Sequence, residues 1–320
     1  MTKLESLEGN YKFIADPSEL SWFFENVLKD LSKESIRKSY LMCIVTRPKK
    51  LSKEEREGFG ISGSDGVMMR EEIISPRGKD HIWSFEEFLT HIYKYECPKR
   101  GMITKNGYAY PDKSLAVMIY AEPSDEVKVA NELVKYAHEI ISQTIEACER
   151  TINFGGADGI KEQLDKMAGI AKKSKSIYAQ STEKIFIHYD FDLNETYKEK
   201  ENREYVEKIL KELHENAFGK GNYFIIKTNG GYHTLVKRTC LGEAAAFFKK
   251  LGKNDPVHGF ADYVDANLNY ALTVGEKRVQ DQCFVPVPGT WMYGSFIPTI
   301  INKDDFKKMK LAVNLYKKLK

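Results

Sequence analysis

The sequence predicts a mixed α+β fold, in which helices and strands intermix along the chain. Of its 320 residues, 42% are hydrophobic and 30% are charged, which is enough apolar material for one large domain or two medium ones. Segments with apolar residues at helical spacing are interspersed with short apolar runs that are typical of buried strands. No apolar run reaches the length of a membrane span, so we expect no membrane partner.

The first half of the chain begins with a helix start at Asp16. The Asp16 side chain can cap the helix, Pro17 suits its first turn, and Glu19 completes a capping box. Apolar side chains then recur at helical spacing as far as Leu31. Further along we expect strands at 40–45 and 115–120, a polar loop at 49–70, and helices at 83–95 and from Ser124 onward.

The second half follows a break at Gly155 and Gly156, after which residues 157–180 are rich in Lys and Ala. We therefore divide the chain into residues 1–156, a helical or linker segment 157–182, and residues 183–320. Within the last part we expect strands at 185–192, 223–227, 233–237 and 284–287, and helices at 203–215, 244–251 and 304–320.

Charge and cysteine usage limit the class of protein. The formal net charge of +3 is weak evidence for a polyanionic partner. The five cysteines are scattered, and no C-x-x-C pair is present, which argues against a zinc finger and fits a reducing compartment. The first ten residues lack the apolar core of a secretory signal. We expect a soluble protein of the cytoplasm, or of the host cytoplasm if a virus or plasmid encodes it.

A strand that ends in two aspartates is the most informative feature. Residues 185–192 read Ile-Phe-Ile-His-Tyr-Asp-Phe-Asp, so Asp190 and Asp192 are two positions apart. Side chains alternate between the faces of a strand, which places both carboxylates on one face, roughly 7 Å apart. Because two such carboxylates repel each other unless a cation lies between them, the pair predicts a Mg²⁺ or Mn²⁺ site. The alternative is a strand that runs into an acidic turn.

A glycine turn and a third carboxylate complete the candidate site. Residues 227–233 read Lys-Thr-Asn-Gly-Gly-Tyr-His, and glycines at positive φ would let backbone N–H groups converge on an anion beside His233. The same residues alone also make a good hairpin turn. Asp265 follows a short apolar step and is a candidate third carboxylate, for which Asp281 competes.

The order of these motifs resembles the archaeo-eukaryotic primase superfamily, the primase–polymerases. The family pattern is hDhD, then S/G-x-H, then hD, often followed by a P-G-S or P-G-T turn, where h is a hydrophobic residue. The counterparts here are residues 187–192, 231–233 and 264–265, with 288–290 closing the series. Two departures are Thr228 at the usual serine and the lack of a basic residue before the Pro-Gly turn.

The resemblance implies an architecture and an activity. Residues 1–156 would form an α/β module that packs against an RRM-like catalytic module of residues 183–320, with the active-site cleft between them. The activity would be template-directed nucleotidyl transfer, in which a DNA primase or primase–polymerase joins NTPs or dNTPs on a single-stranded DNA template. A replicative helicase is a further candidate partner.

The resemblance also implies the metal ligands. Asp190 and Asp192 would bridge two divalent ions, Mg²⁺ or Mn²⁺, and Asp265 would ligate the ion that lowers the pKa of the 3′-hydroxyl. Asp265 is preferred to Asp281 because we expect a strand directly before it.

Binding residues follow on the same basis. Thr228, Gly231 and His233 would hold the triphosphate, and Lys237 is included as a flanking cation. Candidate contacts to the nucleic-acid backbone are the loop cations Arg47, Lys49, Lys50, Lys99 and Arg100, with Tyr108 and Tyr110 as candidates for stacking on bases.

Three other functions remain open from the sequence. A replication-initiator domain that binds nucleic acid without catalysis would explain the basic charge, but not two acids on one strand face. A metal-dependent nuclease uses similar acids, and a gap-filling repair polymerase would share the same site.

Overall fold

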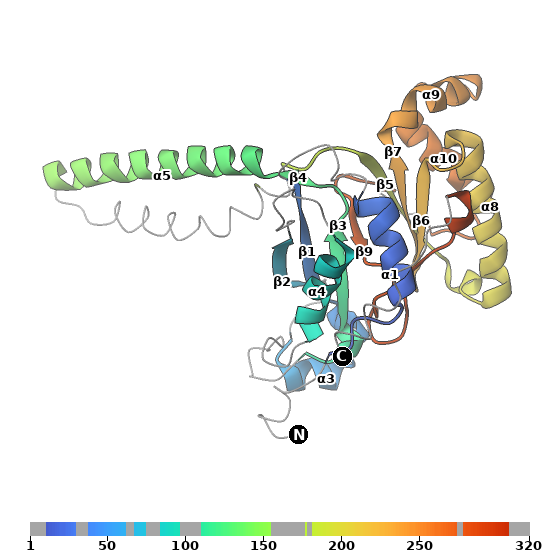
Figure 1. Cartoon of the computed structure of the whole chain (residues 1–320), viewed down its shortest axis with the longest axis horizontal. Coiled ribbons are helices and arrows are strands. Elements are labelled where there is room, and N and C mark those ends of the chain that lie inside the picture. Colours follow the sequence, from blue (N-terminus) through green and yellow to red (C-terminus); the bar gives the residue numbers. More distant parts are fainter. Residues whose placement is uncertain are drawn as a thin grey trace.

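Two antiparallel sheets and the helices around them make up the computed structural model of the chain (Figure 1). The structure describes residues 11–29, 38–61, 67–74, 84–96, 110–154, 177, 181–273 and 278–306. The first sheet has the strand order β2-β1-β3-β9, with β4 paired to β1, and the second has the order β10-β6-β7-β5-β8. The mixed α+β class is therefore confirmed.

The first sheet is built mainly from the N-terminal half of the chain. Its central strand β1 pairs with β2 on one side and with β3 on the other, and β9 lies beyond β3. The strands are β1 (Lys38–Thr46), β2 (Val67–Ile74), β3 (Leu115–Tyr120), β4 (Ser124–Asp125) and β9 (Phe284–Pro286). The strands expected at 40–45 and 115–120 are confirmed.

The loop expected at 49–70 is wrong. Helix α3 (Lys53–Phe59) occupies part of it, because Ser52 and Glu55 form a reciprocal capping box that starts a helix in a polar stretch. Strand β2 begins at Val67 and pairs with β1, so an edge position explains why its sequence is too polar to be recognised as a strand.

The second sheet carries the aspartate strand in its interior. Strand β5 (Phe186–Asp192) pairs with β7 (Gly231–Lys237) along its whole length and with β8 (Val279–Gln280) on its other side. Strand β6 (Tyr223–Lys227) joins β7 as a hairpin, and β10 (Thr299–Ile300) pairs with the outer side of β6.

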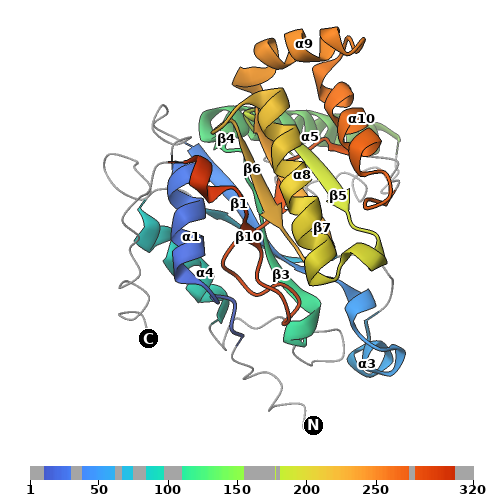
Figure 2. The ribbon, with the colours of Figure 1, turned by 90° about the vertical axis from the view of Figure 1, so that its right-hand side faces the viewer.

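Helices cover the outer face of the second sheet (Figure 2). They are α8 (Lys200–Phe218) and α10 (Pro256–Leu268), and α9 (Leu241–Lys250) packs against both of them beyond one end of the sheet. The helices and the sheet enclose one apolar cluster, to which Tyr189 and Phe191 of β5 contribute alongside Phe260 of α10. Alternation along β5 then turns the intervening side chains toward the opposite face of the sheet.

A second apolar core joins the two sheets. Phe186 of β5 and Phe224 of β6 belong to the same cluster as Met42 of β1 and Val117 of β3. Helix α1 (Pro17–Phe23), its π-helical continuation η1 (Phe24–Leu28) and α4 (Phe85–Glu96) pack into this core. Because β9 comes from the C-terminal half and pairs with β3, the two halves of the chain share a sheet as well as a core.

Helix α1 starts at the residue that the sequence indicates, but the capping box expected from Glu19 is wrong, because the buried Glu19 carboxylate accepts from the Ile300 N–H at 2.6 Å and pairs with Lys303. The Asp16 carboxylate accepts hydrogen bonds from the Ser18 and Glu19 N–H groups, at 2.9 and 3.1 Å, and so caps the helix. The Pro-Gly-Thr turn at 288–290 packs against this start, since the Gly289 carbonyl accepts from the Ala15 and Asp16 N–H groups.

Helix α5 (Glu126–Phe154) projects away from the sheets (Figure 1). Among the described residues, no helix is long and apolar enough to cross a membrane. The linker expected at 157–182 lies outside the described residues except at 177, 181 and 182, and the terminal helix expected at 304–320 lies outside them beyond residue 306. Short 3₁₀ turns are η2 (Pro48–Lys50), η4 (Asp112–Ser114), η5 (Glu195–Tyr197), η6 (Arg238–Cys240) and η7 (Lys303–Asp305).

Close approach between two strands requires glycine at the start of β7. A Cβ added to Gly231 would lie 1.9 Å from the Phe191 carbonyl oxygen of β5, far inside van der Waals contact. Gly231 lies opposite Asp192 in the strand register. Any larger residue here would push β7 away from β5.

The core beneath α8 contains a titratable group. His214 is fully buried, its Nδ1 donates to the Leu210 carbonyl at 2.7 Å, and the ring of Phe260 lies 4.5 Å away between centroids. Burial lowers the pKa of His214 from 6.5 to about 3, because an imidazolium would lose its hydration there.

We expect this histidine to make folding sensitive to acid. The unfolded chain binds more protons than the folded one between pH 6.5 and about 3, so stability falls as the pH drops through that window. The contribution approaches about 1.4 kcal/mol per pH unit. His214→Phe should flatten the dependence of the unfolding free energy on pH, measured by urea denaturation, whereas the same change at the exposed His138 should not. Equal slopes for wild type and His214→Phe would contradict this account.

Gly231→Ala should destabilise the protein by about 1–3 kcal/mol or more, because the added methyl group overlaps the Phe191 carbonyl. Gly242→Ala in α9 is the matched control, since nothing lies within 4 Å of its added Cβ. It should stay within about 1 kcal/mol of wild type. Urea denaturation of both variants tests the close approach, which is refuted if they are equally stable.

Candidate functional site

Strand β5 passes from the shared core into an open cleft. Phe186, His188, Asp190 and Asp192 alternate with residues of the outer cluster and so share the face opposite the helices. Phe186 and His188 are buried, Asp190 is 35% exposed through its side chain, and Asp192 is exposed. The two carboxylates line one cavity together, as their spacing predicts.

The strand order brings the other motifs beside this pair. Asp190 lies opposite His233 and Asp192 opposite Gly231 in the β5–β7 register. On the other side of β5, His188 pairs with Gln280 of β8, and Asp281 follows directly. Three segments that are distant in sequence therefore meet on adjacent strands.

Two cavities adjoin at these strands and share four lining residues: Arg47, Asp190, His233 and Tyr293. The larger has a volume of about 520 Å³, and its other lining residues are Val45, Met118, Tyr120, His188, Gln280, Asp281, Gln282 and Phe284. The smaller has a volume of about 330 Å³, and its lining residues include Lys49, Lys50, Asp192, Glu195, Lys198, Thr228 and Gly230. The larger cavity has both apolar and polar lining residues, and the smaller cavity is lined mainly by charged and polar ones.

Two histidines lie in contact behind Asp190. His188 Nδ1 is 2.9 Å from the Gln282 carbonyl oxygen, and His188 Nε2 is 3.0 Å from His233 Nδ1. A carbonyl can only accept, so His188 Nδ1 carries a proton, and the neutral ring then accepts at Nε2 from the Nδ1–H of His233. In this arrangement the remaining nitrogen of a neutral His233, Nε2, is an acceptor.

Burial controls the charges of these groups. Desolvation lowers the pKa of both histidines to about 4, and for His233 the guanidinium of Arg47 lowers it further. Desolvation also raises the pKa of Asp190, against the attraction of His188, Arg47 and Arg278. Without a ligand, His233 therefore supplies no positive charge at neutral pH, whereas Arg47 does.

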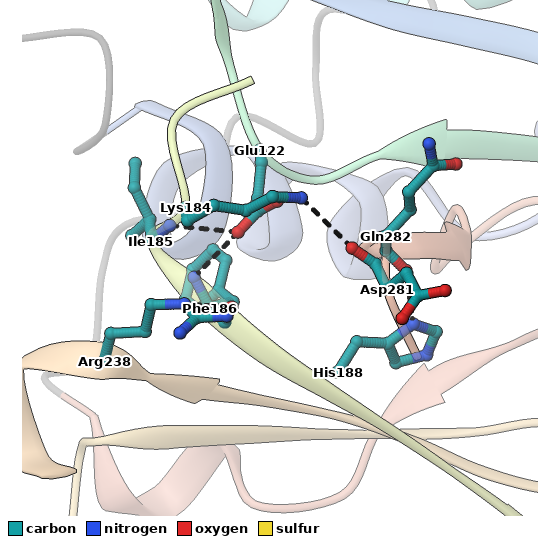
Figure 3. Close-up of polar contacts among 8 residues, drawn as sticks. All are labelled: Glu122, Lys184, Ile185, Phe186, His188, Arg238, Asp281 and Gln282. Atoms are coloured by element: carbon teal, nitrogen blue, oxygen red, sulfur yellow. Dashed lines mark hydrogen bonds and ion pairs between the residues drawn. The ribbon is translucent and has the colours of Figure 1, made fainter. Parts of the chain in front are cut away.

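A polar network positions the segment that carries Asp281 (Figure 3). The buried carboxylate of Glu122 accepts from the Ile185 and Phe186 N–H groups, at 2.9 and 3.1 Å, where β5 begins. The Lys184 ammonium, 3.3 Å from Glu122, donates to the Asp281 carbonyl at 3.1 Å. Together with the bond from His188 to Gln282, this network holds the segment after β8 against the start of β5.

The β6–β7 turn is held by side chains rather than by unusual glycine conformations. The Thr228 hydroxyl donates to the Gly231 carbonyl at 3.1 Å and accepts from its N–H at 3.2 Å. Arg203 of α8 donates to the Thr228 carbonyl from beneath. Neither Gly230 nor Gly231 has a positive φ, so the expected anion-binding conformation of these glycines is wrong. Gly231 serves strand packing instead.

Some of the cations that we expected to bind the nucleic-acid backbone line the site instead. Arg47, Lys49 and Lys50 leave β1 and line the smaller cavity with the carboxylates. Lys99, Arg100 and Tyr108 lie outside the described residues, and Tyr110 packs partly buried against the shared core.

Two residues proposed for the site lie elsewhere. Asp265 lies within helix α10, so the strand expected before it is wrong, and its carboxylate pairs with Arg278 at 3.2 Å. Lys237 ends β7 at the far side from the turn, and its ammonium donates to the Gly221 carbonyl at 3.0 Å. Neither residue lines the two cavities, whereas Asp281 lines the larger one.

Sequence reasoning missed His188, Lys198 and Tyr293. His188 has the spacing of the aspartates, two positions before Asp190, and this period was a usable signal. Lys198 and Tyr293 reach the cleft through turns whose direction no periodic pattern encodes.

The donor set suits a cation that binds together with a phosphorylated ligand. Among the described residues, no group of three or more His, Cys, Asp or Glu side chains is arranged to hold a metal ion. Mg²⁺, however, is commonly held by one or two carboxylates, with waters and substrate phosphates completing its shell. Asp190 and Asp192, accessible and on one face beside three lysines, fit that pattern.

The comparisons with known proteins end without a relative: no protein-family model, no curated protein and no solved structure matches this chain.

Proposed function

We propose that the chain is a template-directed nucleotidyltransferase, a DNA primase or primase–polymerase that joins NTPs or dNTPs on single-stranded DNA. The observation that carries the proposal is the strand order β7-β5-β8. It places His233 and Asp281 on either side of Asp190, around one cavity. The first two motifs of the resemblance, at Asp190 and Asp192 and at His233, meet in this arrangement, whereas Asp265 of the third motif lies outside it.

Asp190 and Asp192 would hold the divalent cations. Bound Mg²⁺ or Mn²⁺ would neutralise charge on the attacking and leaving oxygens of an in-line displacement. The chain's own contribution is to keep both carboxylates on one face of β5, at an edge of the cleft that ligands can reach. The raised pKa of Asp190 reflects the burial that a cation would offset.

The smaller cavity suits the triphosphate of an incoming nucleotide. Its lining contains the cations Arg47, Lys49, Lys50 and Lys198, of which Lys198 pairs with Glu195, together with Asp190 and Asp192. Burial and the neighbouring cations lower the pKa of Lys50, and Glu195 acts in the opposite direction, so an anion bound here would favour the charged form of Lys50. In this role Arg47 and Lys49 bind the incoming nucleotide, whereas the sequence assigned them to the template.

The larger cavity suits a base. Met118, Tyr120 and Phe284 give it an apolar wall, and the rings of Tyr120 and Phe284 lie 4.7 Å apart between centroids. Aromatic side chains stack on any base, which a templated reaction requires. His233 Nε2, as an acceptor, would face a hydroxyl or amine donor between the two cavities.

Asp281 is the better candidate for the third carboxylate. It follows β8, the neighbour of β5, and lines the cavity that contains Asp190. Asp265 is already paired with Arg278 on the helical side of the sheet. In the proposed mechanism Asp281 therefore takes the role that the sequence assigned to Asp265.

A primer-free synthesis assay tests the proposal. We expect the protein to join labelled nucleotides on single-stranded DNA in the presence of Mn²⁺ and without a primer. Asp190→Asn or Asp192→Asn should lower the rate of synthesis at least about 100-fold, because one metal-bridging carboxylate is lost. Asp262→Asn, an exposed aspartate of α10, is the matched control and should retain full activity.

The same assay separates the alternatives. Degradation of the labelled template would indicate a nuclease, and extension only from a primer would indicate a gap-filling repair polymerase. DNA binding without either reaction would indicate a non-catalytic replication-initiator domain. Full synthesis by either aspartate variant would remove the metal assignment.

Asp281→Asn and Asp265→Asn should have opposite consequences. The first should lower synthesis strongly with little change in unfolding free energy, because Asp281 is exposed and lines the cavity. The second should keep synthesis but cost about 1 kcal/mol of stability, because it weakens the pair with the buried Arg278. Rates of synthesis and urea denaturation of both variants decide which aspartate is the third carboxylate. Loss of synthesis in Asp265→Asn alone would restore Asp265 as the third carboxylate.

A further inference from the structure

Tyr293 has a backbone conformation that tyrosine rarely adopts. Its φ is 55°, the only positive value of a non-glycine residue in the described part of the chain. Gly294 follows with φ of 64°, and two successive positive values are the pattern of a type I′ turn. The first central position of such a turn favours Gly, Asn or Asp, so a bulky tyrosine there is strained.

The surrounding structure holds the strained residue in place. The Tyr293 N–H donates to the Leu115 carbonyl at 2.7 Å, and the Met292 N–H donates to the Phe296 carbonyl at 2.7 Å across the turn. The side chain is buried beside Met118 and Val45 of the first sheet. Strain that is maintained in this way clusters at functional sites.

The Tyr293 ring contacts two cations in addition to its apolar neighbours. The guanidinium of Arg47 lies 5.5 Å from the Tyr293 ring centroid, and the ammonium of Lys50 lies 5.7 Å from it. Two like charges repel, yet both are held within the range of a cation–π interaction with one ring. Tyr293 also lines both cavities, at the boundary that they share with Asp190.

We propose that Tyr293 is a positioning residue that holds Arg47 and Lys50 over the smaller cavity, so that they bind a polyphosphate group opposite Asp190 and Asp192. The strained turn directs the ring between the cavities, and the negative face of the ring offsets the repulsion between the two cations. That the polyphosphate belongs to a nucleotide rests on the proposed function, whereas the binding of a polyphosphate does not.

Binding of inorganic tripolyphosphate with Mg²⁺, measured by isothermal titration calorimetry, tests this role. Tyr293→Leu keeps an apolar side chain without a ring face, and we expect its Kd to rise about tenfold. Tyr293→Phe keeps the ring but loses the hydroxyl contact with Arg47, so its Kd should lie between those of wild type and Tyr293→Leu. Tyr205→Leu, which removes an exposed tyrosine of α8, is the matched control and should bind as wild type does.

A double-mutant cycle distinguishes positioning from general damage. Because Tyr293 acts through Arg47 and Lys50, Arg47→Gln combined with Tyr293→Leu should lose less affinity than the sum of the two single losses, and the remaining effect of Tyr293→Leu reflects Lys50. Wild-type affinity in folded Tyr293→Leu, or fully additive losses in the double variant, would overturn the proposal.

An isosteric ring keeps the test decisive if Tyr293→Leu fails to fold. Pentafluorophenylalanine at position 293 matches phenylalanine in shape but lacks the negative ring face, so it should weaken tripolyphosphate binding relative to Tyr293→Phe. Equal binding of these two would refute the role. Ring-dependent binding without any DNA synthesis would instead refute the proposed function and leave the role of Tyr293 standing.

Discussion

The pairing of β5 with β7 is the contact on which the rest of the site depends. Seven residues of each strand are in register, from Phe186 opposite Lys237 to Asp192 opposite Gly231. A slip of one position would turn both aspartates into the apolar cluster beneath the helices and bring Tyr189 and Phe191 into the cleft. In this register the Phe191 carbonyl approaches Gly231 so closely that no residue with a Cβ fits there without a shift of the strands.

Around this pairing, opposite charges from the two sheets line one cavity. The carboxylates stand on β5, and the cations come mainly from the exit of β1, in the other sheet. The shared core that includes Phe186 and Met42 holds the two sheets together and therefore sets how far apart these charges lie. The cleft presents carboxylates and cations together, which suits a ligand that carries both a cation and an anion. Such preorganisation lowers the reorganisation required on binding.

Several polar side chains support the site through hydrogen bonds to the backbone and do not line the smaller cavity. Glu122, Lys184 and His188 hold the segment after β8, and Arg203 holds the turn before β7. Each bonds to backbone groups, and Glu122, His188 and Arg203 do so from buried positions, where unpaired backbone groups would be costly. Backbone hydrogen bonds also hold the turn of Tyr293 beside the first sheet: the Tyr293 N–H donates to Leu115, and the Met292 N–H donates across the turn to Phe296.

The sequence alone determined whatever depends on local periodicity. The aspartate strand, the hairpin β6–β7, helix α8 and the cap at Asp16 all follow from alternation, helical spacing or capping chemistry, and the structure contains them. Only the tertiary structure decided which distant residues meet. Asp265 and Asp281 have similar local contexts in sequence, but α10 carries one to the helical side and β8 carries the other to the cleft. Strand order and the direction of turns are set by the packing of the whole core, and no short stretch of sequence encodes them.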